Sequence, residues 1–133
     1  MAIDGLKSLR SRHEPKQTMD RLEAEVVARG MTVFSRIDHA AGAVAVDLPL
    51  RPTELLIFGH PRAGTPLMQS VQTIGIDLPL KTLVWQDASG DTWISWNDPS
   101  WLAQRHGLSA ETATAVGSMS AAIDAIAKAA ASK

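Results

Sequence analysis

Apolar residues recur at two spacings along this chain, and each spacing predicts a different kind of element. Alternation of apolar and polar residues is typical of a strand, whereas recurrence at three and four residues is typical of a one-sided helix. Strands are therefore expected at residues 5–12, 31–38, 55–58, 81–86 and 92–97. Helices are expected at residues 18–29, from residue 65, at residues 98–107 and from residue 109 onward.

Local signals mark the ends of several of these elements. Thr18 is a typical N-cap for the first helix, and Gly30 suits the left-handed residue that follows a helix. Asp98 followed by Pro99 is likewise an N-cap with a proline in the first helical turn. Asp87 to Asp91 has the composition of a hairpin loop between two strands.

The second strand and the stretch before the fourth strand depart from a simple pattern. In the second strand Met31, Val33 and Ile37 are expected to share one face, although Phe34 interrupts the alternation. Residues 74–80 also alternate, but they contain a proline, which cannot donate to a strand ladder. We therefore expect them to form an edge strand or an extended lead-in.

The last predicted helix has one apolar stripe that must cover another layer. The stripe consists of residues at helical spacing: Val116, Met119, Ile123, Ile126 and Ala130. An apolar sheet is the natural partner for such a stripe. Strands followed by helices predict an α+β fold, in which an antiparallel sheet carries helices packed on one face. We expect a single domain over residues 1–133.

The sequence LLIFGHPRAGTPLM at residues 55–68 is the clearest local signal for a binding site. It predicts a buried strand, a tight loop and a helix start with Thr65 as N-cap. Arg62 and Gly64 would then lie beside free backbone N–H groups that suit an anion. The alternative is that these residues supply only turn chemistry and a solvated charge.

Composition narrows the classes of protein that this chain can belong to. Its 133 residues suffice for one domain with a core, and its net charge of −1 gives no field that favours nucleic acid. The lack of cysteine excludes disulfides and thiolate chemistry, and the lack of tyrosine excludes a tyrosine acid or base. No signal peptide and no apolar run of roughly 20 residues is visible, so we expect a cytoplasmic protein without a membrane partner.

A family resemblance is carried by four linked motifs: GMTVFSRIDHAAGA, LRPTELLIFGHPRAGTPLM, IDLPLKTLVW and the NDP-x-WLAQRHGL run. Together they resemble domain-of-unknown-function family 302 over residues 18–108, with residues 109–131 as a covering C-terminal helix. The resemblance implies a TBP-like β-α-β(4)-α topology with extra short helices, and a homodimer. It implies no activity, because the family has none established. This chain has His60 where the family usually has asparagine, and Trp96 where it often has tyrosine.

Histidines supply the remaining candidate chemistry. His39 or His60 would serve as the general base if the protein were an enzyme, because histidine titrates in the useful range. Asp38 and His39 are not expected to form a dyad, since adjacent strand residues point to opposite faces. A distant partner for His39, or a purely structural role, remains open. No cofactor is predicted. No metal site is predicted either, because none of the four histidines lies three or four residues from another ligand type: His13, His39, His60 and His106.

Three functions are consistent with these patterns. The leading hypothesis is a self-associating module that binds a small anionic ligand through Arg62, Gly64 and Thr65, with His60 and His39 at the rim. The second is an enzyme with a histidine general base. The third is a structural dimerisation or protein-interaction domain, in which tryptophans and the last helix form the contact.

Overall fold

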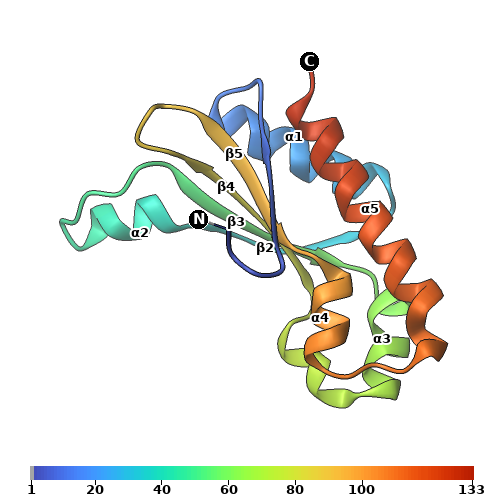
Figure 1. Ribbon diagram of the computed structural model, residues 1–133. Coiled ribbons are helices and arrows are strands. Elements are labelled where there is room, and N and C mark those ends of the chain that lie inside the picture. Colours follow the sequence, from blue (N-terminus) through green and yellow to red (C-terminus); the bar gives the residue numbers. More distant parts are fainter. Residues whose placement is uncertain (1) are drawn as a thin grey trace.

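The computed structural model describes residues 2–133, which form an α+β fold (Figure 1). Its strands are β1 (Leu6–Arg10), β2 (Thr32–Asp38), β3 (Thr53–Gly59), β4 (Leu80–Gln86) and β5 (Thr92–Asn97). Its α-helices are α1 (Pro15–Ala28), α2 (His39–Ala45), α3 (Pro61–Ser70), α4 (Pro99–Arg105) and α5 (Ala113–Ala131). Two 3-10 helices, η1 (Gln72–Ile76) and η2 (Ala110–Thr112), complete the described chain.

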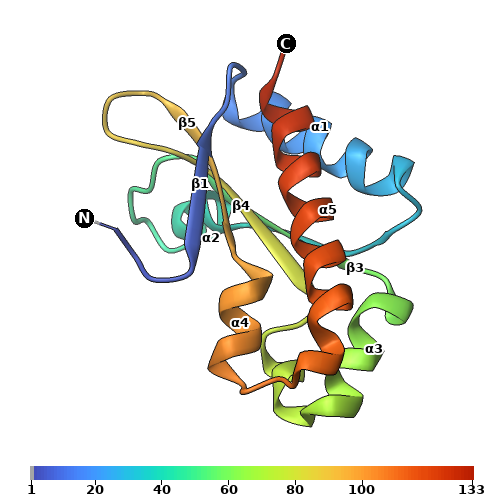
Figure 2. The ribbon, with the colours of Figure 1, turned by 45° about the vertical axis from the view of Figure 1, so that its right-hand side comes forward.

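The five strands form one antiparallel sheet in the order β1-β5-β4-β3-β2. With the short helices set aside, the chain order is β-α-β(4)-α, which confirms the predicted fold class and topology. The helices α1 and α5 lie side by side on one face of the sheet, as both ribbon views show (Figures 1 and 2).

The core lies between these two helices and the sheet. The helix α1 contributes Met19, Leu22 and Val26, all of them fully buried, because three- and four-residue spacing places them on one side. Leu56 and Phe58 of β3 are buried on the same face of the sheet. Every member of the predicted α5 stripe is also buried, as expected from its spacing: Val116, Met119, Ile123, Ile126 and Ala130.

The other face of the sheet is not covered by α1 or α5, and we call it the open sheet face. The strand register places the following large apolar side chains there, half-buried or exposed: Ile37, Leu55, Ile57, Leu83, Trp85 and Trp93. The rings of Trp85 and Trp93 stack with their centroids 6.3 Å apart. Trp96 lies on the helix-covered face and is buried, as its odd separation from Trp93 predicts.

The first helix begins three residues earlier than predicted. It starts at Pro15, with Glu14 as an extended N-cap residue, because proline suits the first helical position. Thr18 is therefore not the cap. Its hydroxyl lies inside the fold and pairs with the Ser11 hydroxyl at 2.7 Å. Gly30 has a φ of +76°, as expected for the residue that ends this helix.

A β-bulge in β2 changes which residues share a face. The register shifts between Val33, which pairs with Phe58, and Ser35, which pairs with Ile57. Because Phe34 is the extra residue, Val33 and Ile37 lie on opposite faces, and the prediction that they share one was wrong. Ile37 belongs to the open sheet face.

Residues 74–80 were predicted as extended but begin within η1, so their alternation is not that of a strand. The strand β4 begins at Leu80, the last residue of this segment. The Asp98 cap is confirmed, since its Oδ1 accepts a hydrogen bond from the Ser100 N–H at 3.1 Å. Gly107, the last residue of the predicted helix, has a φ of +66° just beyond the end of α4.

The helices α3 and α4 lie together beyond one end of the sheet, whereas α2 projects at its other end (Figures 1 and 2). This arrangement follows from strand direction, because β3 and β5 end where α3 and α4 begin. None of the helices within residues 2–133 is both long and apolar enough to cross a membrane.

Candidate functional site

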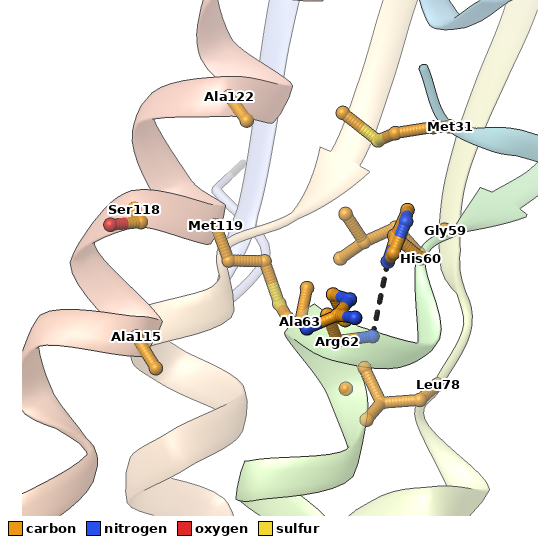
Figure 3. A pocket seen from close by; sticks show the side chains of 12 residues that line it. Met31, Gly59, His60, Arg62, Ala63, Leu78, Ala115, Ser118, Met119 and Ala122 are labelled. Atoms are coloured by element: carbon orange, nitrogen blue, oxygen red, sulfur yellow. Dashed lines mark hydrogen bonds between the residues drawn. The ribbon is translucent and has the colours of Figure 1, made fainter. Parts of the chain in front are cut away.

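A cavity of about 270 Å³ lies where β3 turns into α3, and α5 forms its far wall (Figure 3). The residues that line it come from the ends of three strands, the first turn of α3 and the first half of α5. They are Met31, Gly59, His60, Arg62, Ala63, Gly64, Leu78, Leu80, Ala115, Ser118, Met119 and Ala122. Residues more than 50 positions apart in the chain therefore share this cavity.

The helix α3 begins at Pro61, with His60 as its N-cap, and not at Thr65 as predicted. His60 has an extended backbone, and its Nδ1 accepts a hydrogen bond from the Arg62 N–H at 3.1 Å. Pro61 occupies the first helical position, where its missing N–H costs nothing. Thr65 therefore lies within the helix, followed by an interior Pro66.

This early helix start removes the free N–H groups that the anion hypothesis assumed. The Arg62 N–H is bound by the His60 imidazole, and the N–H groups of Ala63 and Gly64 donate to the His60 carbonyl at 2.9 and 3.2 Å. Pro61 has no N–H to offer. An anion at this position would have to be bound by side chains.

Two side-chain donors remain at the cavity. Because His60 Nδ1 accepts a hydrogen bond, the neutral imidazole carries its proton on Nε2, which is then free to donate. The Arg62 side chain is exposed, and its guanidinium has no ion-pair or hydrogen-bond partner among residues 2–133. A neutral donor and a cation thus lie at one end of the cavity.

Gly64 lines the cavity and, having no side chain, leaves space in its wall. A Cβ atom built at this position would lie 3.4 Å from Leu78 Cδ1, an ordinary van der Waals contact. The site therefore tolerates a small side chain at residue 64, which would narrow the cavity. Thr65 lines a neighbouring cavity of about 270 Å³ that shares four lining residues with the first one: Gly59, His60, Gly64 and Leu78.

His39 lies apart from the other predicted site residues. It begins α2, directly after β2, while His60 follows Gly59, which pairs with Thr32 at the opposite end of that strand. Six residue steps along β2 separate these ends by roughly 20 Å. His39 is exposed and cannot reach the cavity rim or Arg62. The structure thus brings together His60, Arg62 and Gly64, with Thr65 nearby.

A histidine network that the sequence analysis did not anticipate joins η1 to the end of α4. The Nε2 of His106 lies 2.6 Å from Asp77 Oδ2, and its Nδ1 lies 3.1 Å from the Thr73 hydroxyl. The Arg105 guanidinium donates to both Asp77 carboxylate oxygens, at 3.0 and 2.9 Å. No local spacing could have revealed it, because Asp77 and His106 are 29 residues apart.

The comparisons with known proteins concern family and fold. Residues 7–126 match the sequence profile of the family described as "Domain of unknown function DUF302". A crystal structure described as an uncharacterized conserved protein DUF302 from Bacillus stearothermophilus superposes with a TM-score of 0.85 at 17% identity. The superposition covers 96% of this chain and 99% of the Bacillus stearothermophilus chain. At 17% identity it demonstrates a shared fold alone.

Curated relatives with a stated activity are longer than this chain. Over 115 residues, the chain is 50% identical to proteins named fluoride-specific ion channel FluC 1 from Brucella suis biovar 1 (strain 1330) and Brucella abortus biovar 1 (strain 9-941). The match covers 86% of this chain but 45% and 43% of those relatives. The chain thus spans less than half of their length.

Proposed function

The chain belongs to the DUF302 family, and from this premise we propose that it is a cytosolic, self-associating module that binds a small anionic ligand. The ligand site is the cavity between α3 and α5. The observation that carries the proposal is the pair of donors at its rim, His60 Nε2–H and the Arg62 guanidinium. Neither has an acceptor among residues 2–133, and an arginine guanidinium is well suited to binding oxyanions.

A binding role is favoured over catalysis by a histidine base at this site. In its neutral form His60 already uses its basic Nδ1 to cap α3, and its Nε2 carries the proton. To accept a proton, the ring would have to release the cap. The other predicted base, His39, follows the last residue of β2, whereas the cavity lies at the first residue of that strand. His39 is therefore far from His60 and Arg62.

Titration calorimetry with inorganic phosphate tests the anion site. Arg62→Ala should weaken binding about tenfold or more, because a hydrogen bond to a charged group contributes roughly 1.5–3 kcal/mol. Arg12→Ala is the matched control, since Arg12 is also exposed and has no side-chain partner among residues 2–133. Equal affinities of wild type and Arg62→Ala would remove Arg62 from the site.

Fluoride is a second anion that the comparisons favour. The relatives named as fluoride-specific channels share half of their aligned residues with this chain, and we propose that this domain serves proteins that handle fluoride. A fluoride electrode would measure the free ion in the presence of wild type and Arg62→Ala. No depletion of free fluoride by the wild type would remove fluoride as a ligand of this chain.

The self-association part of the proposal rests on uncovered apolar surface. In addition to the open sheet face, α2 and the loop after it expose four large apolar side chains by 49% to 70%: Val44, Val46, Leu48 and Leu50. A group of exposed large apolar side chains is typical of an interaction site. We assign it to a second copy of the chain.

Sedimentation velocity tests self-association. The double variant Val44→Asp/Leu48→Asp should be monomeric at concentrations where the wild type is a dimer, because charges would enter the apolar contact. Both side chains are more than 60% exposed, so the fold should be retained. Ile76→Asp is the control, since Ile76 is 76% exposed in η1, beyond the opposite end of the sheet. A monomeric wild type would overturn the assignment.

A further inference from the structure

We propose that the ligand of the α3–α5 cavity is a monocarboxylate with an apolar body of about ten carbon atoms. Its carboxylate would contact His60 and Arg62, and its body would lie between α3, the start of β4 and α5. This inference rests on the proposed anion site and specifies the chemical class of its ligand.

The walls of the cavity are apolar apart from the rim. Figure 3 shows Met31 and Met119 approaching the cavity from opposite sides, with Leu78 below His60. Ala115 and Ala122 complete the α5 wall, and the hydroxyl of Ser118 points away from His60 in this view. An inorganic anion would contact the rim alone, whereas a ligand with an apolar body would also gain the free energy of removing this apolar surface from water.

The volume of the cavity sets the size of the apolar body. An apolar cavity of about 150 Å³ holds a molecule of benzene. The present cavity, of about 270 Å³, is nearly twice as large. It therefore has room for roughly ten to twelve carbon atoms. Methionine side chains are unbranched and adapt to irregular shapes, so the two in the wall suit a flexible chain.

The donors at the rim favour a carboxylate head. Arg62 offers a planar guanidinium and His60 offers one N–H, which together match two oxygens and a single negative charge. A phosphate ester would bring nearly two charges to a rim where Arg62 is the only cation among the lining residues. The helix terminus itself adds no donor, because its N–H groups are satisfied by His60.

The test compares decanoate with acetate by titration calorimetry on the full chain. Decanoate should bind at least about tenfold more tightly than acetate, because its chain buries apolar surface in the cavity. Ala122→Phe should weaken decanoate binding about tenfold by filling the cavity, and should leave acetate binding unchanged. Ala121→Phe is the matched control, because Ala121 is the exposed neighbour on α5 and does not line the cavity.

The outcomes separate this inference from the proposed function. Equal binding of decanoate and acetate, both lost in Arg62→Ala, would overturn the apolar body and keep the anion site. Absence of binding of decanoate, acetate and phosphate to the wild type would overturn both. Decanoate binding that survives Ala122→Phe and Arg62→Ala would place it on another surface and overturn the inference. Binding to phosphatidylglycerol vesicles that Ala122→Phe abolishes would identify a membrane lipid and overturn a free carboxylate as the ligand.

Discussion

The imidazole Nδ1 of His60 accepts a hydrogen bond from the backbone N–H of Arg62, at 3.1 Å. Asparagine is a preferred N-cap residue, and its side-chain oxygen lies the same number of bonds from Cα as Nδ1 of histidine. Histidine thus preserves the cap while it presents a different outer donor, Nε2–H. His60 thus both caps α3 and lines the cavity.

The hydrogen bond from the Arg62 N–H to His60 predicts how substitutions at His60 change the free energy of unfolding. His60→Ala should lower the free energy of unfolding by about 1 kcal/mol, because the Arg62 N–H loses its acceptor, whereas His60→Asn should stay close to the wild type. Urea denaturation of the three proteins measures this order. If the asparagine variant were as destabilised as the alanine variant, the imidazole would have a role other than capping.

In the network around Asp77, substitutions of Asp77 and of Arg105 should lower the free energy of unfolding by different amounts. The side chain of Asp77 is 16% exposed and that of His106 is 9% exposed, so Asp77→Ala leaves a nearly buried imidazole without its acceptor. We expect a loss of about 1–3 kcal/mol in the free energy of unfolding. Arg105→Ala should cost less than about 1 kcal/mol, because that side chain is 51% exposed. Equal losses in denaturant unfolding would contradict this account.

The stability difference between the wild type and Asp87→Asn should depend on pH. The Trp93 indole N–H, followed by the backbone N–H groups of Asp91 and Ser89, holds the pKa of Asp87 below its usual value. A lowered folded-state pKa contributes stability above the unfolded pKa of about 3.9, and this contribution is lost as the pH falls through the folded pKa. Asp87→Asn should therefore lower Tm near neutral pH, and the difference from wild type should shrink in acid.

Thermal unfolding between roughly pH 7 and pH 2.5 measures that difference. Asp4→Asn is the control, because Asp4 is exposed and its carboxylate has no hydrogen-bond partner among residues 2–133. A Tm difference for Asp87→Asn that stays constant across the whole range would show that charge on this carboxylate does not stabilise the fold.

The sequence determined the features that depend on neighbouring residues. The stripe on α5, the Asp98 cap, the strand β5 and the α+β class all follow from periodicity and local capping, because the free energies that favour them act within a few residues. The family resemblance correctly supplied the topology. Local rules failed where two of them competed, as at Thr18 and Thr65, because a proline upstream offered an earlier first helical position.

Tertiary structure decided the features that depend on distant residues. The cavity joins Met31, His60 and Met119, and the network joins Asp77 to His106, although no spacing rule connects these positions. Gly5 is a further case: its φ is +76°, and a Cβ atom there would lie 2.3 Å from Trp101 Cδ2, so the Trp101 ring requires glycine. The separation of His39 from His60 likewise depends on strand direction and register, which are set by burial across the whole sheet.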